Sequence, residues 1–214
     1  MILDALHADG IDINELVKAV ATNTDPAAGS AFRKEIRTAV MDQLADLPQI
    51  QRKEKLDFYY GKALESAGGV GQSFAGSLFE TYAIAFPPAS LTSVDTLVND
   101  TRIEGSLRKA DGIYDTPREG LETEFGTLSG EYFVEAKGGK DAFSIEQARN
   151  YSEKLDEGKI TNANGKEMEG VIYVFQDQGA ARMAARKIEI SNLDESIHVF
   201  FHSGSTTVET QWLR

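Results

Sequence analysis

The sequence predicts an α/β or α+β protein in which helices flank a mixed central β-sheet, preceded by a helical N-terminal segment. Three observations favour this class. Apolar residues recur at helical spacing through the first third of the chain, short β-branched and aromatic runs follow it, and amphipathic stretches separate those runs. Helix, strands, helix, strand, helix and strand therefore follow one another, which is the order expected for helices packed on a mixed sheet.

Three helices are expected in the N-terminal segment. Asp12 or Asn14 can cap a short first helix. Asp25-Pro26 begins a second helix, with a capping residue followed by proline at the first helical position, and Pro48 ends it. A third helix is expected from about Gln49 to Ser66, with its apolar side chains on one side.

A glycine cluster, Gly68–Gly71, interrupts the helical pattern. Glycines before a helix can expose backbone N–H groups to a phosphate, but this cluster lacks the lysine and hydroxyl residue of a P-loop. We interpret it as a hinge or helix stop. It predicts a helical segment over residues 1–68 and a main domain over residues 69–214.

The main domain opens with a helix that Pro87-Pro88 ends. Val171–Phe175 is β-branched and aromatic throughout, which is typical of a strand buried on both faces. Glycine and proline punctuate the other runs, including a loop expected at Gly126–Gly130. The expected elements are the helix Gln72–Phe86, strands Arg102–Glu104, Leu107–Tyr114 and Glu131–Lys137, the helix Ser144–Leu155, strand Val171–Phe175, a short helix Gly179–Arg186, and strands Ile197–Phe201 and Thr206–Trp212.

Composition excludes several classes of function. The chain has 214 residues and no cysteine, which removes disulfides, thiol catalysis and zinc–thiolate sites and fits a reducing compartment. It has no apolar run of about 18 residues, so we expect no membrane span. Its start lacks a basic region followed by an apolar core, so we expect no signal peptide. The net charge of −12 argues against broad contact with nucleic acid unless cations gather locally.

The strand Glu131–Lys137 carries two residues that are unusual in a core. Glu135 and Lys137 are two positions apart, so they project from the same face of a strand. They can form an ordinary ion pair at a strand end, or a carboxylate and an ammonium arranged for chemistry. If the upstream strand pairs with this one, Asp111 meets Glu135 across the ladder at roughly 5 Å. Two such carboxylates suit Mg²⁺, although Asp111 can equally begin an Asp-Gly turn.

Other residues extend or limit this arrangement. Glu80, on the helix before the strands, can supply a third carboxylate. His198 and His202 share a strand face but lie about 13 Å apart at roughly 3.3 Å per residue, so one metal cannot bind both. Gln147 has two readings, because Ser144 and Gln147 also fit a capping box. Tyr151 lies one helical turn from Gln147 on the same face, and by itself it is typical of a packed aromatic.

Together these residues resemble the PD-(D/E)XK nuclease superfamily. Asp111 is followed by Glu135-Ala136-Lys137, and the Gln147-to-Tyr151 segment is similar to the Q-x-x-x-Y element of the RecB-like branch. The resemblance spans roughly residues 71–201, and Ala110 stands where the family name has proline. It implies a restriction-endonuclease-like fold and Mg²⁺- or Mn²⁺-dependent hydrolysis of phosphodiester bonds.

The resemblance also implies roles for individual residues. The catalytic set would be Asp111, Glu135, Lys137, Gln147 and Tyr151. The metal ligands would be Glu80, Asp111 and Glu135. The candidate phosphate contacts are Arg108, Lys109, Lys140 and Arg149, with Arg182, Arg186 and Lys187 farther along the chain.

The expected partner is nucleic acid, with DNA favoured over RNA or tRNA. Compact members of the superfamily resemble bacterial antagonism toxins, which implies an immunity or delivery protein and a cytoplasmic site of action, reached by delivery into another bacterial cell. The alternative is a non-enzymatic α/β module that binds a protein through its acidic surface. A phosphatase using the same carboxylates is a third hypothesis, which no P-loop supports.

Overall fold

The computed structural model describes residues 2–11, 38–65, 69–88, 90–94, 102–105, 110–123, 126–138, 143–202 and 210–213. The chain forms two compact units, Met1–Tyr82 and Ala83–Arg214. The boundary thus falls inside a helix, α5 (Gly69–Ala85), and later than the predicted division after residue 68. Phe79 of α5 packs against Tyr60 at 6.4 Å between ring centroids, which ties most of this helix to the first unit.

The first unit is helical. It contains α1 (Ile2–Ala8), a helical stretch over residues 38–44, α4 (Gln49–Glu65) and most of α5. α4 agrees with the helix predicted from Gln49 to Ser66, whereas α1 was not predicted. Asp9 follows α1 and binds α4, accepting hydrogen bonds from Lys55 at 2.6 Å and from the Tyr59 hydroxyl at 2.9 Å. The helix expected after Asp12 and the start of the one expected after Pro26 lie outside the described residues.

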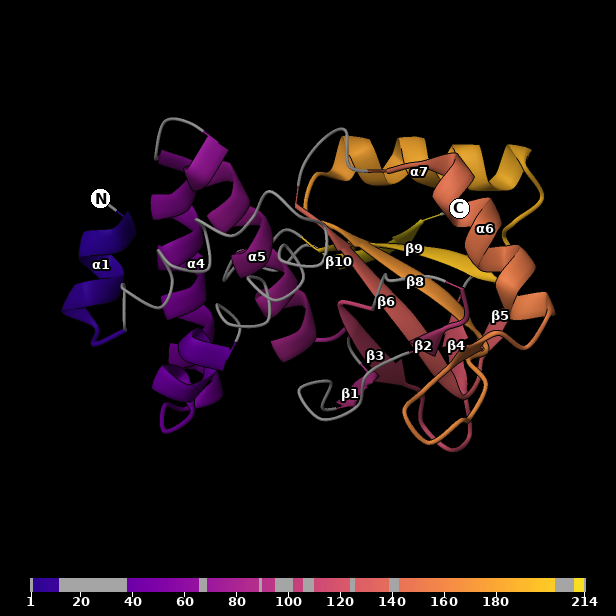
Figure 1. Cartoon of the computed structure of the whole chain (residues 1–214), viewed down its shortest axis with the longest axis horizontal. Coiled ribbons are helices and arrows are strands. Elements are labelled where there is room, and N and C mark those ends of the chain that lie inside the picture. Colours follow the sequence, from indigo (N-terminus) through magenta and orange to yellow (C-terminus); the bar gives the residue numbers. More distant parts are fainter. Residues whose placement is uncertain are drawn as a thin grey trace. The chain divides into compact units, whose positions relative to one another are not determined.

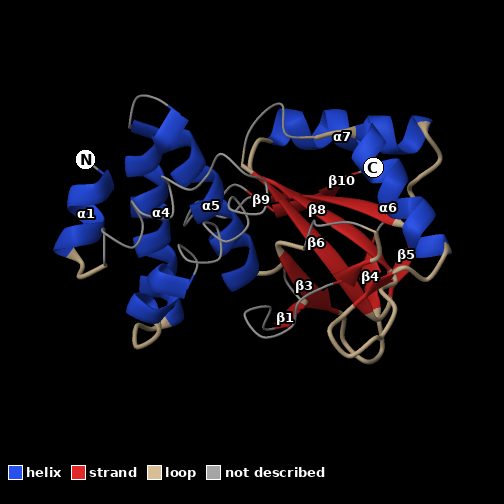
Figure 2. Cartoon of the chain, viewed as in Figure 1, coloured by secondary structure: helices blue, strands red, loops and turns tan. Residues whose placement is uncertain are grey.

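The second unit is built on a six-stranded mixed sheet with the order β1-β3-β6-β8-β9-β10 (Figure 2). The parallel core of the sheet is β6–β8–β9, while β1–β3–β6 and β9–β10 pair antiparallel. Its strands are β1 (Thr92–Val94), β3 (Gly112–Asp115), β6 (Glu131–Lys137), β8 (Gly170–Phe175), β9 (Ile197–His202) and β10 (Thr210–Leu213). The predicted α/β class with a mixed central sheet is therefore confirmed.

Two short strand pairs lie outside this sheet. β2 (Arg102–Ile103) pairs with β7 (Ile160–Thr161), so the strand predicted at Arg102–Glu104 does not join the main sheet. β4 (Leu121–Thr123) pairs with β5 (Gly126–Leu128), so the loop expected from Gly126 contains a strand. Gly126 itself adopts a φ of +129°, which glycine tolerates where other residues do not.

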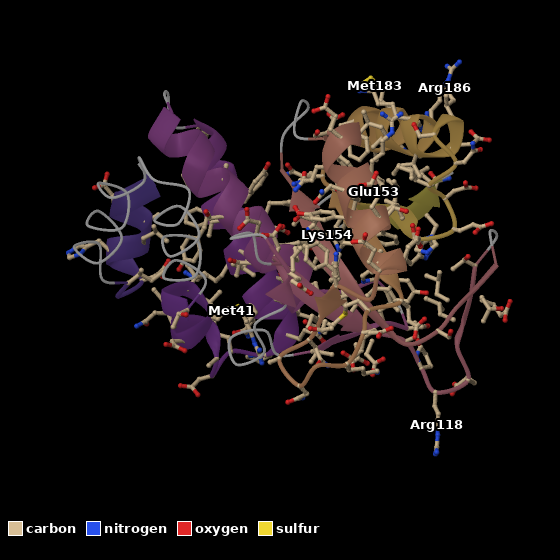
Figure 3. All side chains as sticks on the ribbon, turned by 45° about the vertical axis from the view of Figure 1, so that its right-hand side comes forward. Met41, Arg118, Glu153, Lys154, Met183 and Arg186 are labelled. Carbon is tan, nitrogen blue, oxygen red and sulfur yellow. The ribbon has the colours of Figure 1, made fainter. Side chains whose placement is uncertain are left out.

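Two helices cover one face of the sheet (Figure 1). α6 (Ile145–Asp156) begins after Ser144, whose side chain caps it, as predicted. α7 (Gln178–Ile190) begins after Asp177, which accepts a hydrogen bond from the Ala180 N–H, and it extends beyond the predicted end at Arg186. Four alanines and one isoleucine of α7 are buried against the sheet, and outer side chains such as Met183 and Arg186 point away from it (Figure 3). No helix within the described ranges is long and apolar enough to cross a membrane.

Candidate active site

A buried acidic group lies near the carboxyl end of β6. Strand alternation turns Phe133, Glu135 and Lys137 to the sheet face that α6 covers. Glu135 is only 6% exposed. Its Oε2 accepts a hydrogen bond from the Lys137 ammonium at 2.7 Å, and its Oε1 accepts one from the Tyr151 hydroxyl at 2.6 Å. The two oxygens are thus each held by a donor, as a buried carboxylate requires.

Two residues of α6 support this carboxylate. Gln147 and Tyr151 lie one turn apart, and the Gln147 side-chain amide donates to the Tyr151 hydroxyl at 2.7 Å. The Tyr151 ring packs edge-on against Phe133, with 5.0 Å between centroids. Ser144 caps the helix by accepting from the Gln147 backbone N–H at 3.3 Å, so the backbone of Gln147 serves the cap while its side chain serves the site. The result is a hydrogen-bonded chain from Gln147 through Tyr151 to Glu135.

Asp111 stands directly before β3 and reaches the same place. The register pairs Gly112 with Val134, which brings Asp111 beside Glu135 as the sequence predicted. The Asp111 backbone N–H donates to the Val134 carbonyl at 3.0 Å, and Asp111 Oδ2 accepts from the Ala136 N–H at 2.9 Å. Asp111 therefore directly precedes a strand of the main sheet, and its carboxylate is anchored to the backbone of β6.

The electrostatics of the second unit reflect this convergence. Burial raises the pKa of the Glu135 carboxyl; the Lys137 ammonium opposes this rise, and the Asp111 charge adds to it. Burial likewise raises the pKa of the Tyr114 hydroxyl, and the Asp111 charge again adds to the effect. Within the described part of the chain, the Lys137 ammonium is the cation that acts on the Glu135 carboxylate.

Lys137 is the last residue of β6. Its side chain is 14% exposed, and its ammonium lies 5.8 Å from the centroid of the Tyr173 ring. The Gln176 N–H donates to the Lys137 carbonyl at 3.2 Å, so the ends of β6 and β8 meet here. In open α/β sheets, ligands approach at the carboxyl ends of parallel strands. Lys137 therefore lies at the carboxyl end of an interior strand, the position where ligands bind in many sheets of this kind.

Of the other residues predicted as metal ligands or nearby phosphate contacts, the structure describes Glu80 and Arg149. Glu80 is buried, but it belongs to the first unit, and its role as a third metal ligand stays a prediction. Arg149 is exposed and donates to the Ser191 hydroxyl at 3.4 Å, near the end of α7. Arg108, Lys109 and Lys140 lie outside the described residues. Among the residues that the structure describes, no group of three or more histidine, aspartate and glutamate side chains is arranged to hold a metal.

Sequence reasoning missed the aromatic residue beside Lys137. Tyr173 lies on β8 opposite Glu135 in the parallel register, and Phe143 packs edge-on against its ring at 5.2 Å between centroids. The only signal in the sequence was its place within an apolar strand, which predicts a core residue. The register that brings it to Lys137 is a non-local property.

The fold and the site together define a class: an α/β protein with a mixed sheet and a carboxylate–lysine cluster at the carboxyl end of its central strand. No protein-family model matches the chain, and neither does any of the curated proteins or solved structures with which it was compared.

Proposed function

We propose that this protein is a metal-dependent nuclease that hydrolyses phosphodiester bonds, with DNA favoured over RNA. One observation carries the proposal. Asp111, Glu135 and Lys137 converge from two paired strands, and the Gln147–Tyr151 pair of α6 is hydrogen bonded to Glu135. These residues also carry the resemblance to the PD-(D/E)XK superfamily, so the geometry and the motif order favour the same chemistry.

The donor set fits a hard divalent cation. Asp111 and Glu135 offer carboxylate oxygens, and Mg²⁺ or Mn²⁺ is commonly bound by one or two carboxylates, with water completing its coordination. The two acids lie close enough for the Asp111 charge to raise the pKa of Glu135, a repulsion that a shared cation would relieve. When bound, the metal would polarise the scissile phosphate and lower the pKa of a water ligand. Glu80 is proposed as a third ligand.

The protein's own residues have distinct roles in this proposal. Lys137 presents an ammonium at the strand end, where it would pair with a phosphate oxygen and stabilise the negative charge that develops during hydrolysis. Tyr151 fixes the orientation of Glu135 through its 2.6 Å hydrogen bond, and Gln147 fixes the Tyr151 hydroxyl. Residues that orient a ligand in this way are commonly needed for full metal affinity.

Substrate binding has to overcome the acidic charge of the chain. Local cations act over a Debye length of about 8 Å in physiological salt, so a few basic residues near the site can outweigh distant acids. Arg108, Lys109, Lys140 and Arg149 are proposed for this purpose. A net charge of −12 suits a protein that binds nucleic acid weakly by itself and is delivered to it, or inhibited, by a partner protein.

The test is hydrolysis of plasmid DNA and tRNA with and without Mg²⁺. We expect Glu135→Gln and Lys137→Met to abolish cleavage. The chain offers a matched control on the same strand and face, because Glu131 pairs with Lys166 at 2.9 Å at the other end of β6. Glu131→Gln should cleave normally. Cleavage of neither substrate by the wild type, or normal cleavage by both site variants, would show that the proposal is wrong.

A non-enzymatic interaction module is the second candidate. It is favoured by the observation that Lys137 and Tyr151 each occupy one oxygen of Glu135, as they would in a structural ion pair. Calorimetry with Mn²⁺ separates the two candidates. The nuclease predicts binding that is lost in Asp111→Asn, whereas the module predicts no binding by either protein.

A further inference from the structure

The ammonium of Lys137 has two neighbours of different chemistry. Glu135 Oε2 accepts its hydrogen bond at 2.7 Å, and the Tyr173 ring lies 5.8 Å from Nζ at its centroid. The face of an aromatic ring attracts a cation within about 6 Å, and the attraction increases when water is excluded. Tyr173 is fully buried and the Lys137 side chain is 14% exposed, so this contact is largely shielded from solvent.

Packing holds the Tyr173 ring in place. Phe143 meets it edge-on at 5.2 Å between centroids, and Phe175 stacks beside it at 6.2 Å with 26° between the ring planes. The parallel register places Tyr173 opposite Glu135 and Phe175 opposite Lys137. A lysine side chain is flexible and its ammonium acts as a point charge without preferred direction. A rigid ring at this position therefore restricts where the ammonium can lie.

We propose that Tyr173 is a positioning residue, which holds the ammonium of Lys137 at the carboxyl end of β6 through the face of its ring. The catalytic consequence rests on the proposed nuclease function, whereas the contact itself does not. If a divalent cation were bound to the Glu135 carboxylate, the attraction of this carboxylate for the Lys137 ammonium would be weaker. The Tyr173 ring would not bind the metal, so its attraction for the Lys137 ammonium would be unchanged.

The contact is tested first without any reference to activity. A double-mutant cycle compares the wild type with Tyr173→Leu, Lys137→Met and the double variant. The unfolding equilibrium of each protein is measured by the fluorescence of Trp212, the single tryptophan, which lies in the second unit. We expect the unfolding equilibrium constant of the double variant to differ by about threefold to tenfold from the value that the two single substitutions would give if their effects were independent. Phe201→Leu with Lys137→Met is the matched control, since Phe201 is a buried aromatic on β9, one strand farther from β6. That pair should combine without coupling.

The second test is kinetic. Tyr173→Leu should lower kcat about tenfold while leaving KM and the Mn²⁺ affinity within about twofold, because the contact that is removed is with the Lys137 ammonium and not with a proposed metal ligand. Tyr173→Phe keeps the ring face and should restore the lost rate. Phe201→Leu, compared per folded molecule, reports the effect of a smaller core residue alone.

The outcomes separate the two proposals. Absence of coupling in the unfolding cycle overturns the positioning role, whether or not the protein is a nuclease. In an active protein, an unchanged kcat in Tyr173→Leu, or an equal loss in Tyr173→Phe, also overturns it. Coupling in a protein that cleaves neither substrate supports the Tyr173–Lys137 contact and rejects the nuclease.

Discussion

The Tyr151 hydroxyl links α6 to the buried acid of β6, and its removal gives a sharp prediction. Tyr151→Phe retains the ring that packs on Phe133 and deletes the hydroxyl that donates to Glu135 and accepts from Gln147. A hydrogen bond to a charged group contributes about 1.5–3 kcal/mol, and the half-buried Gln147 amide can turn to water. We therefore expect a loss of about 2 kcal/mol in the free energy of unfolding.

Urea unfolding followed by Trp212 fluorescence measures this loss in the second unit. If the free energy of unfolding falls by about 2 kcal/mol per molar urea, the urea concentration at the unfolding midpoint should fall by about 1 M. Gln147→Met is the control, because it removes a neutral bond one step from the acid and should cost about 0.5–1 kcal/mol. A Tyr151→Phe midpoint within about 0.2 M of the wild type would refute the reasoning.

The loss of unfolding free energy caused by Tyr151→Phe should also depend on pH. The folded pKa of Glu135 is raised above its ordinary value of 4.5 mainly by burial, and the bond from Tyr151 partly opposes the rise. The contribution of this group to stability is therefore fully present below the unfolded pKa and is lost as pH rises through the folded pKa. Removing the hydroxyl raises the folded pKa further, so the loss caused by Tyr151→Phe should grow from acidic to alkaline pH. An equal loss at pH 5 and pH 8 would contradict a bond to the ionised form.

Three further predictions concern the sheet. Gly170→Ala should destabilise the second unit by about 2 kcal/mol in urea unfolding, because its Cβ would lie 2.6 Å from the Ser196 carbonyl oxygen; a neutral effect would refute this clash. Burial lowers the pKa of His198 to about 4, so NMR titration of its ring should show a midpoint far below 6.5. The free energy of unfolding should therefore fall as pH drops from 6.5 through 4, whereas a titration midpoint near 6.5 would contradict this prediction. Tyr114→Phe should cost about 1–2 kcal/mol in thermal or urea unfolding, because its hydroxyl donates to the Ala83 carbonyl at 2.6 Å, and an unchanged stability would show that bond to be dispensable.

The parts of the fold that the sequence predicts are those with long, regular patterns. β6, α6 and β8 were expected within a residue or two, because each combines a continuous apolar run or an amphipathic period with a cap or glycine at its end. β2 and β7 each contain two residues, which is too short for any period to show. The boundary after Tyr82 depends on which unit the middle of α5 packs against, which is a tertiary property.

The candidate site likewise has a part that the sequence predicts and a part that it does not. The Glu135–Lys137 and Gln147–Tyr151 pairs follow from spacing within one element, since i and i+2 share a strand face and i and i+4 share a helix face. The approach of Asp111 required the pairing of two strands, and that prediction is confirmed by their register. Tyr173 could not be predicted, because its place beside Lys137 depends on the parallel alignment of β6 with a strand more than thirty residues away.

The bond from the Ala136 N–H to Asp111 Oδ2 has a consequence for how the molecule assembles. A slip of one residue between β3 and β6 would turn Asp111 to the opposite face of the sheet and break that bond, because neighbouring residues of a strand face opposite sides. The Asp111 carboxylate thus stabilises the correct register of the two strands, in addition to being a candidate metal ligand. The proposed chemistry at this cluster accordingly requires the native register of β3 and β6.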